Sequence, residues 1–145
     1  MNEAAKRQAI ADEARSWSRT PYHHAARIKG AGVDCAQLPA AIYEAVGLIP
    51  HLEPEYSPQW MMHRDEEQYL AWIRPYAREI TRDQLAMGDL VVFKYGRTYS
   101  HSAIVLDLPN VIHAMNRDGR VIISDLDRDA AFIDRPALYF SLFGA

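Results

Sequence analysis

The 145-residue sequence contains a single cysteine, so no disulfide can form within the chain. The fold therefore does not depend on an oxidising compartment. Long apolar runs are also missing: none approaches the roughly 20 residues of a membrane-spanning helix, and residues 1–17 are too polar for a secretory signal peptide. We expect synthesis in the cytoplasm without a signal peptide, and no membrane partner.

The sequence has no large excess of charge of one sign. Its net charge is −3, and the lysines and arginines are spread along the chain without a basic stripe, which argues against nucleic acid as a partner. Apolar residues make up 49% of the sequence, which is enough for one hydrophobic core at this length. We expect a single domain over residues 1–145.

The cysteine, Cys35, lies at the expected start of a helix. Asp34 suits the N-cap position, and the helix should run to about Val46 with Gly47 as its stop. Pro39 removes one backbone hydrogen bond after the first turn, so we expect a local distortion there. The helix start favours an anion, so the thiol should lose its proton more readily than a free cysteine and act as a nucleophile. The alternative is a small buried apolar residue.

Helical patterns come first in the chain and extended patterns follow. Residues 2–17 and 65–78 have apolar side chains at helical spacing, and Pro75 should kink or end the second of these helices. After a turn at Gly88-Asp89, short apolar runs predict strands at residues 90–95, 100–106, 111–115, 121–124 and 138–143. Helices followed by an antiparallel sheet make an α+β arrangement.

Residues 48–62 form a proline-rich and aromatic-rich segment that is too long for a simple turn. The segment is either a lid or substrate wall, or a loop packed on the core. Its large side chains are candidates for an exposed docking surface, with packing on the domain's own helices as the alternative. These side chains are Tyr56, Trp60, Met61 and Met62.

Two histidines lie inside predicted strands, which are rigid enough to aim a side chain. A cysteine nucleophile needs a base, and that base needs a polar group to orient it, so His101 and His113 can fill both roles. Two alternatives remain: each histidine is a half-buried strand residue, or both join Cys35 in a zinc site that lacks a clear fourth ligand.

The strand register tests whether the two histidines can meet. Side chains alternate between the two faces of a strand, so both imidazoles share one cleft only if cross-strand partners have residue numbers with an even sum. This requires a hairpin loop of three or five residues centred near Asp107 or Leu108, unless a bulge intervenes.

Four motifs together resemble the NlpC-type cysteine peptidases, which are papain-like cell-wall endopeptidases. The resemblance covers roughly residues 20–124 and rests on these stretches: Gly-Val-Asp34-Cys35, Gly88-Asp89-Leu90-Val91-Val92-Phe93, Ser100-His101-Ser102-Ala103-Ile104-Val105 and Val111-Ile112-His113-Ala114. It implies a papain-like α+β fold, with the nucleophile at a helix N-terminus packed on a C-terminal antiparallel sheet.

By this resemblance Cys35 is the nucleophile, His101 the general base and His113 the residue that orients it. Tyr22 follows Pro21, and the family's Pro-Tyr pair places a phenol in the active site; a packing tyrosine is the alternative. Asp34 joins Tyr22 as a predicted substrate-binding residue. The resemblance implies no metal and no cofactor.

The sequence departs from the family's usual pattern around the cysteine. Ala36-Gln37 replaces a common Ser-Gly, and residues 23–26 replace paired glycines. The pattern is most similar to the phage and prophage branch, in which such domains accompany tail proteins. We therefore predict a peptidase or amidase acting on peptidoglycan stem peptides, with phage tail proteins as partners and incorporation in a virion. The alternative is a structural tail-assembly protein with little activity.

Overall fold

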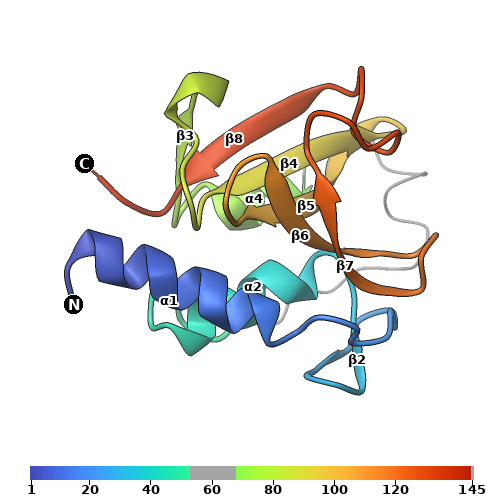
Figure 1. Cartoon of the computed structure of the whole chain (residues 1–145), viewed down its shortest axis with the longest axis horizontal. Helices are drawn as coiled ribbons and strands as arrows, with labels where there is room; N and C mark the ends of the chain where they lie inside the picture. Colours follow the sequence, from blue (N-terminus) through green and yellow to red (C-terminus); the bar gives the residue numbers. More distant parts are fainter. Residues whose placement is uncertain (53–67, 145) are drawn as a thin grey trace.

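Helices and strands form two layers, with α1 and α2 on one side of a six-stranded antiparallel sheet (Figure 1). The computed structural model describes residues 1–52 and 68–144. The described helices are α1 (Glu3–Arg15), α2 (Gln37–Ala45) and α4 (Gln68–Ile73), with a 3-10 turn η1 (Arg82–Gln84). In these parts of the chain, no helix is long and apolar enough to cross a membrane.

The large sheet has the strand order β3-β8-β4-β5-β6-β7, and every pair is antiparallel. Its strands are β3 (Arg78–Ile80), β4 (Leu90–Tyr95), β5 (Thr98–Val105), β6 (Asn110–Met115), β7 (Arg120–Asp125) and β8 (Ala137–Ser141). A separate two-stranded ribbon precedes the cysteine and consists of β1 (Arg27–Ile28) and β2 (Gly32–Val33).

The predicted α+β order is confirmed, and one predicted helix ends earlier than expected. The helix expected over residues 65–78 ends at Ile73, before Pro75, and its predicted start lies outside the described residues. Arg78 belongs instead to β3, which pairs with β8 at the edge of the sheet. The pairs β1–β2 and β3–β8 were not predicted, because two- and three-residue strands are too short to show an alternating pattern.

The sheet is buried on both faces. One face packs against the helices, with Ile10 of α1 and Ile42 of α2 in the same cluster as Val92 and Ile104. The other face carries a smaller cluster with stacked Phe93 and Phe132 rings, whose centroids are 4.3 Å apart. Since successive strand residues alternate in direction, β4 and β5 supply both clusters.

A bulge interrupts the pairing of β4 with β5. Phe93 pairs with His101, but Lys94 pairs with Tyr99, so Ser100 is an extra residue in β5. Such a bulge bends its strand and re-aims neighbouring side chains. It therefore alters the direction of β5 beside one of the predicted site histidines.

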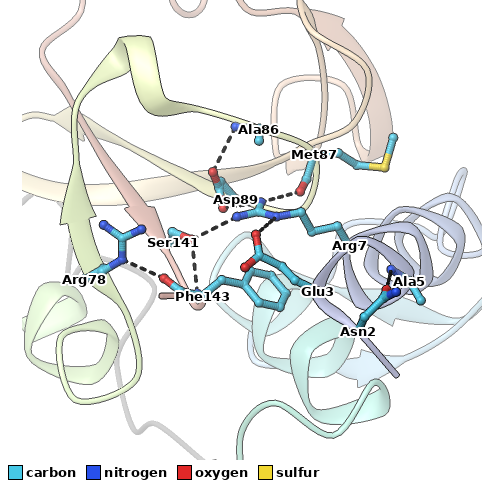
Figure 2. A network of polar contacts seen from close by, with 10 residues as sticks. All are labelled: Asn2, Glu3, Ala5, Arg7, Arg78, Ala86, Met87, Asp89, Ser141 and Phe143. Atoms are coloured by element: carbon cyan, nitrogen blue, oxygen red, sulfur yellow. Dashed lines mark hydrogen bonds and ion pairs between the residues drawn. The ribbon is translucent and has the colours of Figure 1, made fainter. Parts of the chain in front are cut away.

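A partly buried ion pair ties α1 to the sheet (Figure 2). Arg7 Nη1 lies 2.8 Å from Asp89 Oδ1 and donates to the Met87 carbonyl at 2.7 Å. Asp89 is fully buried, and its other oxygen accepts from Ala86 N at 2.9 Å. Arg7 Nη2 also reaches Ser141 Oγ of β8 at 3.4 Å. One arginine thus joins α1 to the start of β4 and the end of β8.

Candidate active site

The turn before α2 is held by the buried carboxylate of Asp34. Asp34 Oδ1 accepts hydrogen bonds from Ala36 N at 3.1 Å and from Gln37 N at 2.9 Å, while Oδ2 accepts from Ala25 N at 2.6 Å. Asp34 therefore caps the turn, as its position in the sequence indicated. Because its oxygens bind these backbone groups, its role toward substrate stays a prediction.

Pro39 lies in the first turn of α2, where backbone N–H groups have no partner within the helix, so the distortion expected there stays a prediction. Pro39 has no N–H to donate to the Cys35 carbonyl, and α2 begins only at Gln37, so Cys35 lies in the turn ahead of it. Ser102 Oγ donates to the freed carbonyl at 3.0 Å. The one hydroxyl proton of Ser102 is donated to the Cys35 carbonyl, so Ser102 can only accept a hydrogen bond from Tyr69. The Tyr69 hydroxyl, 2.6 Å away, is therefore the donor to Ser102.

The cysteine is held against the residues on either side of His101. Its Sγ donates to the carbonyl of Ser100, the bulge residue, at 3.6 Å, and its own carbonyl is bound by Ser102. Ser100 and Ser102 thus fix Cys35 to the segment of β5 that carries His101.

The β5–β6 hairpin has the register that brings the two histidines together. Ile104 pairs with Ile112 and Val105 with Val111, so partner numbers have an even sum. Residues 106–110 lie between the last paired positions and are centred on Leu108. The predicted five-residue, odd-length connection is confirmed.

The histidine rings meet edge to face. His101 Nε2 and His113 Nδ1 are 2.9 Å apart, and the ring planes are at 79°. On the far side of its ring, His113 Nε2 lies 2.8 Å from Ser124 Oγ of β7. Phe132, from the smaller cluster on the face of the sheet away from the helices, contacts both imidazole rings. Both imidazoles are therefore buried and held in fixed orientations.

Burial lowers the pKa of both histidines. For His101, desolvation and the neighbouring His113 put the pKa well below 6.5. For His113, desolvation lowers the pKa to about 4, although the carboxylates of Asp129 and Asp118 oppose the shift. Both rings are neutral at pH 7, so each carries one proton and one lone pair.

The expectation of a thiolate near neutral pH is wrong for this closed site. Burial raises the pKa of the Cys35 thiol to about 12, and the Asp34 carboxylate adds to the rise. The nearby Tyr22 phenol and backbone groups act in the opposite direction, but their effects on the pKa are smaller. Desolvation of the charged form outweighs the helix-start effect here, so the resting group is a neutral thiol.

Tyr22 packs against the hydrophobic core and lies near Cys35, so its predicted role toward substrate stays a prediction. It forms an isolated β-bridge with Val33, and its backbone N–H donates to the Gly119 carbonyl at 2.8 Å. Its phenol lies near enough to Cys35 for the two groups to influence each other's ionisation. Burial and the nearby Cys35 and Asp34 raise the pKa of the phenol, which keeps it a proton donor.

Sequence reasoning missed the polar residues that hold these groups. Strand alternation alone would have placed Ser102 on the face opposite His101, toward the helices, where a polar side chain needs a partner. Ser100 acts through its backbone carbonyl, which leaves no signal in the sequence. Ser124 carried a weaker signal, since only the β6–β7 register brings it near His113. Tyr69 had no signal beyond its place on the apolar side of a helix.

In residues 1–52 and 68–144, no group of three or more His, Cys, Asp or Glu side chains has the arrangement needed to hold a metal ion. The candidate docking side chains Tyr56, Trp60, Met61 and Met62 lie outside the described residues.

The model of the NlpC/P60 family matches residues 19–132. This range contains Tyr22, Asp34, Cys35, His101 and His113. The chain belongs to the NlpC/P60 family. This family of cysteine peptidoglycan hydrolases also has non-catalytic members. No curated protein sequence matches the chain.

Solved structures of NlpC/P60 domains share the fold. The NlpC/p60 domain of the peptidoglycan hydrolase SagA has a TM-score of 0.65 at 20% identity, with 91% of this chain and 96% of that one covered. The peptidoglycan hydrolase RipB from Mycobacterium tuberculosis has a TM-score of 0.67 at 19% identity, covering 100% and 70%. RipD from the same organism, described as non-catalytic and adapted to peptidoglycan binding, has a TM-score of 0.64 at 13% identity, covering 95% and 98%.

Several other matched structures are longer proteins, of which this chain spans less than half. The predicted papain-like NlpC-type fold is thus confirmed.

Proposed function

We propose that this NlpC/P60 protein is a cysteine peptidase that hydrolyses peptide bonds in peptidoglycan stem peptides. The observation that carries the proposal is the attachment of Cys35 to Ser100 and Ser102, the two residues that flank His101. His101 in turn has its Nε2 atom 2.9 Å from His113. A nucleophile, a base and a group that orients the base are therefore present on adjoining elements.

The proton inventory of the site indicates general-base catalysis. His113 occupies Nε2 of His101, so Nδ1 is the ring nitrogen that remains to receive the Cys35 proton. As Sγ attacks the substrate carbonyl carbon, that proton passes to Nδ1; His101 then returns it to the departing amine, which leaves a thioester on Cys35. Water, activated by the same nitrogen, hydrolyses the thioester and restores the thiol.

Tyr22 is placed to stabilise the oxyanion that forms during the attack. Its phenol lies near Cys35, and its raised pKa keeps it protonated. A protonated phenol beside the attacked carbonyl can donate to the developing negative charge. We assign Tyr22 this role toward the substrate.

Digestion of purified peptidoglycan tests the proposal. The wild-type protein should release peptide fragments with new amino termini, detected by mass spectrometry, whereas Cys35→Ala should release none. The fragment masses identify the bond that is cut; the γ-D-glutamyl to diamino acid bond is the usual target of the family that the motifs resemble. Folded wild-type protein that binds peptidoglycan without cutting it would instead favour a binding role like that described for RipD.

We further infer an association with a phage or prophage tail. The support is the overall motif pattern, with its departures at Ala36-Gln37 and residues 23–26, which resembles the phage branch of the family. In that setting the protein is made in the host cytoplasm and carried in the virion. Mass spectrometry of purified particles should find it, and its absence from particles would contradict the association. A structural tail role with little activity is the outcome if particles contain the protein but digestion fails.

A further inference from the structure

The backbone hydrogen bonds at the start of α2 have a gap at the nucleophile. Leu38 N donates to the Asp34 carbonyl at 3.0 Å, and α2 follows from Gln37 onward. With helical spacing, the next bond would run from the N–H of residue 39 to the Cys35 carbonyl, but Pro39 has no N–H. The carbonyl of the nucleophile is therefore left for a donor outside its own helix.

The outside donor is a buried hydroxyl of the sheet. Ser102 Oγ donates to the Cys35 carbonyl at 3.0 Å and accepts from the Tyr69 hydroxyl of α4 at 2.6 Å. All three residues are at most 5% exposed, so bulk water does not compete for these bonds. Two hydrogen bonds in series thus join α4, β5 and the turn that carries the nucleophile.

The Tyr69 hydroxyl directs the proton of Ser102. A serine hydroxyl has one proton and rotates to suit its partners. A donor 2.6 Å away occupies a lone pair of Ser102 Oγ, which turns the proton toward the Cys35 carbonyl. Tyr69 therefore strengthens a bond to the nucleophile that it does not itself make.

The bond to Ser102 is the contact of Cys35 with β5 that persists through the proposed reaction. The other contact, from Cys35 Sγ to the Ser100 carbonyl at 3.6 Å, is a weak thiol hydrogen bond. It is lost when the thiol gives its proton to His101, whereas the Cys35 carbonyl keeps its donor. Because Ser102 follows His101 directly in β5, this bond keeps the backbone of the nucleophile beside the base.

We propose that Ser102 and Tyr69 are positioning residues that hold the nucleophile in register with His101. They act through the Cys35 carbonyl, which Pro39 leaves without a helical partner. The line of hydrogen bonds stands on the geometry alone, whereas its effect on catalysis rests on the proposed function.

Two substitutions separate positioning from the simple satisfaction of a buried carbonyl. Ser102→Ala removes the donor to Cys35 and should lower the melting temperature by roughly 3–10 °C. In Pro39→Ala the new N–H of residue 39 can bind the same carbonyl, so the stability cost of Ser102→Ala should largely vanish in that background. The bond to β5 is not restored there, so the catalytic cost should remain.

Kinetics on a synthetic stem peptide measure the catalytic cost. Ser102→Ala should reduce kcat by roughly a hundredfold with little change in KM, in the wild type and in the Pro39→Ala background alike, since a misplacement of about 1 Å can cost this much. Tyr69→Phe should reduce kcat less, by roughly tenfold. Tyr43→Phe is the matched control, because this buried helix tyrosine donates instead to the Gly88 carbonyl at 2.8 Å.

Two kinetic results would overturn the proposal. A catalytic cost that vanishes together with the stability cost in the Pro39→Ala background would mean that Ser102 only satisfies a buried carbonyl. An unchanged kcat in both Ser102→Ala and Tyr69→Phe would mean that neither hydroxyl positions the nucleophile.

Alkylation of Cys35 with iodoacetamide tests the placement without a stem peptide. At pH 7.5 the rate should fall by roughly tenfold or more in Ser102→Ala, in both backgrounds, toward the rate of His101→Ala, because the thiol no longer meets its base. A rate at or above that of the wild type would overturn the proposal. The expected alkylation pattern in a protein that hydrolyses no stem peptide would count against the proposed function and leave the positioning role standing.

Discussion

Acid should destabilise this fold through its buried histidines, and His113 allows the size of the effect to be worked out. Its pKa falls from 6.5 to about 4 on folding because the ring is desolvated. As pH falls below 6.5, the unfolded chain therefore binds the proton first, and stability is lost. At 1.36 kcal/mol per pKa unit, the folded state loses about 2 kcal/mol by pH 5 and about 3 kcal/mol by pH 4 through this group.

Urea unfolding at a series of pH values measures this loss. The free energy of unfolding of the wild type should drop between pH 7.5 and pH 4, and the drop in His113→Asn should be smaller by about 3 kcal/mol, because asparagine does not titrate. His101 is shifted in the same direction and should account for part of what remains. His23→Asn, at an exposed position, controls for the loss of one histidine.

A difference below about 1 kcal/mol between the pH dependences of the wild type and His113→Asn would refute the reasoning, since it would mean that the ring is not held neutral by burial. A wild type that gains stability on acidification would contradict the sign as well.

Three further predictions concern single residues. Arg7→Ala should lower the free energy of unfolding by about 3–5 kcal/mol, because it leaves the buried Asp89 carboxylate unpaired, whereas Arg15→Ala at an exposed ion pair should cost less than about 1 kcal/mol; equal losses in urea unfolding would contradict this. Tyr22→Phe should reduce kcat on a stem peptide by roughly a hundredfold with an unchanged circular dichroism spectrum, and an unchanged kcat would exclude the phenol as an oxyanion donor. Thiolate absorbance at 240 nm, taken as the difference between wild type and Cys35→Ser, should be absent at pH 8, since burial raises the thiol pKa to about 12; a signal there would show a preformed thiolate.

Local patterns predicted the elements of this fold better than their edges. The strand over residues 90–95 appears with the predicted bounds, because its apolar run is bracketed by Gly88 and Gly96, both with positive φ. The short strand β3 could not be predicted, since only its pairing with β8 makes it a strand. Helix propensity over residues 74–78 gave way to Pro75 and to that pairing.

In the candidate site, too, features set by local sequence were predicted, whereas features set by tertiary packing were not. Register arithmetic placed His101 and His113 together because alternation is a local property of strands. The acidity of Cys35 was misjudged because its largest cause, desolvation, depends on the packing of β5 and α2 around the thiol and has no signature in the helix start. Ser124 was missed for a related reason, since only a neighbouring strand brings it to His113.

Capture of the acyl-enzyme tests most directly whether Cys35 is the nucleophile of a stem-peptide peptidase. Wild-type protein mixed with a synthetic stem peptide, quenched in acid within the first turnovers and digested, should yield a Cys35-containing fragment whose mass is increased by the acyl part of the peptide. The increase should disappear on treatment with hydroxylamine, which cleaves thioesters, and hydrolysis should be lost in Cys35→Ala. Hydrolysis that continues in Cys35→Ala, or turnover by the wild type with no adduct on Cys35 at any quench time, would contradict the account.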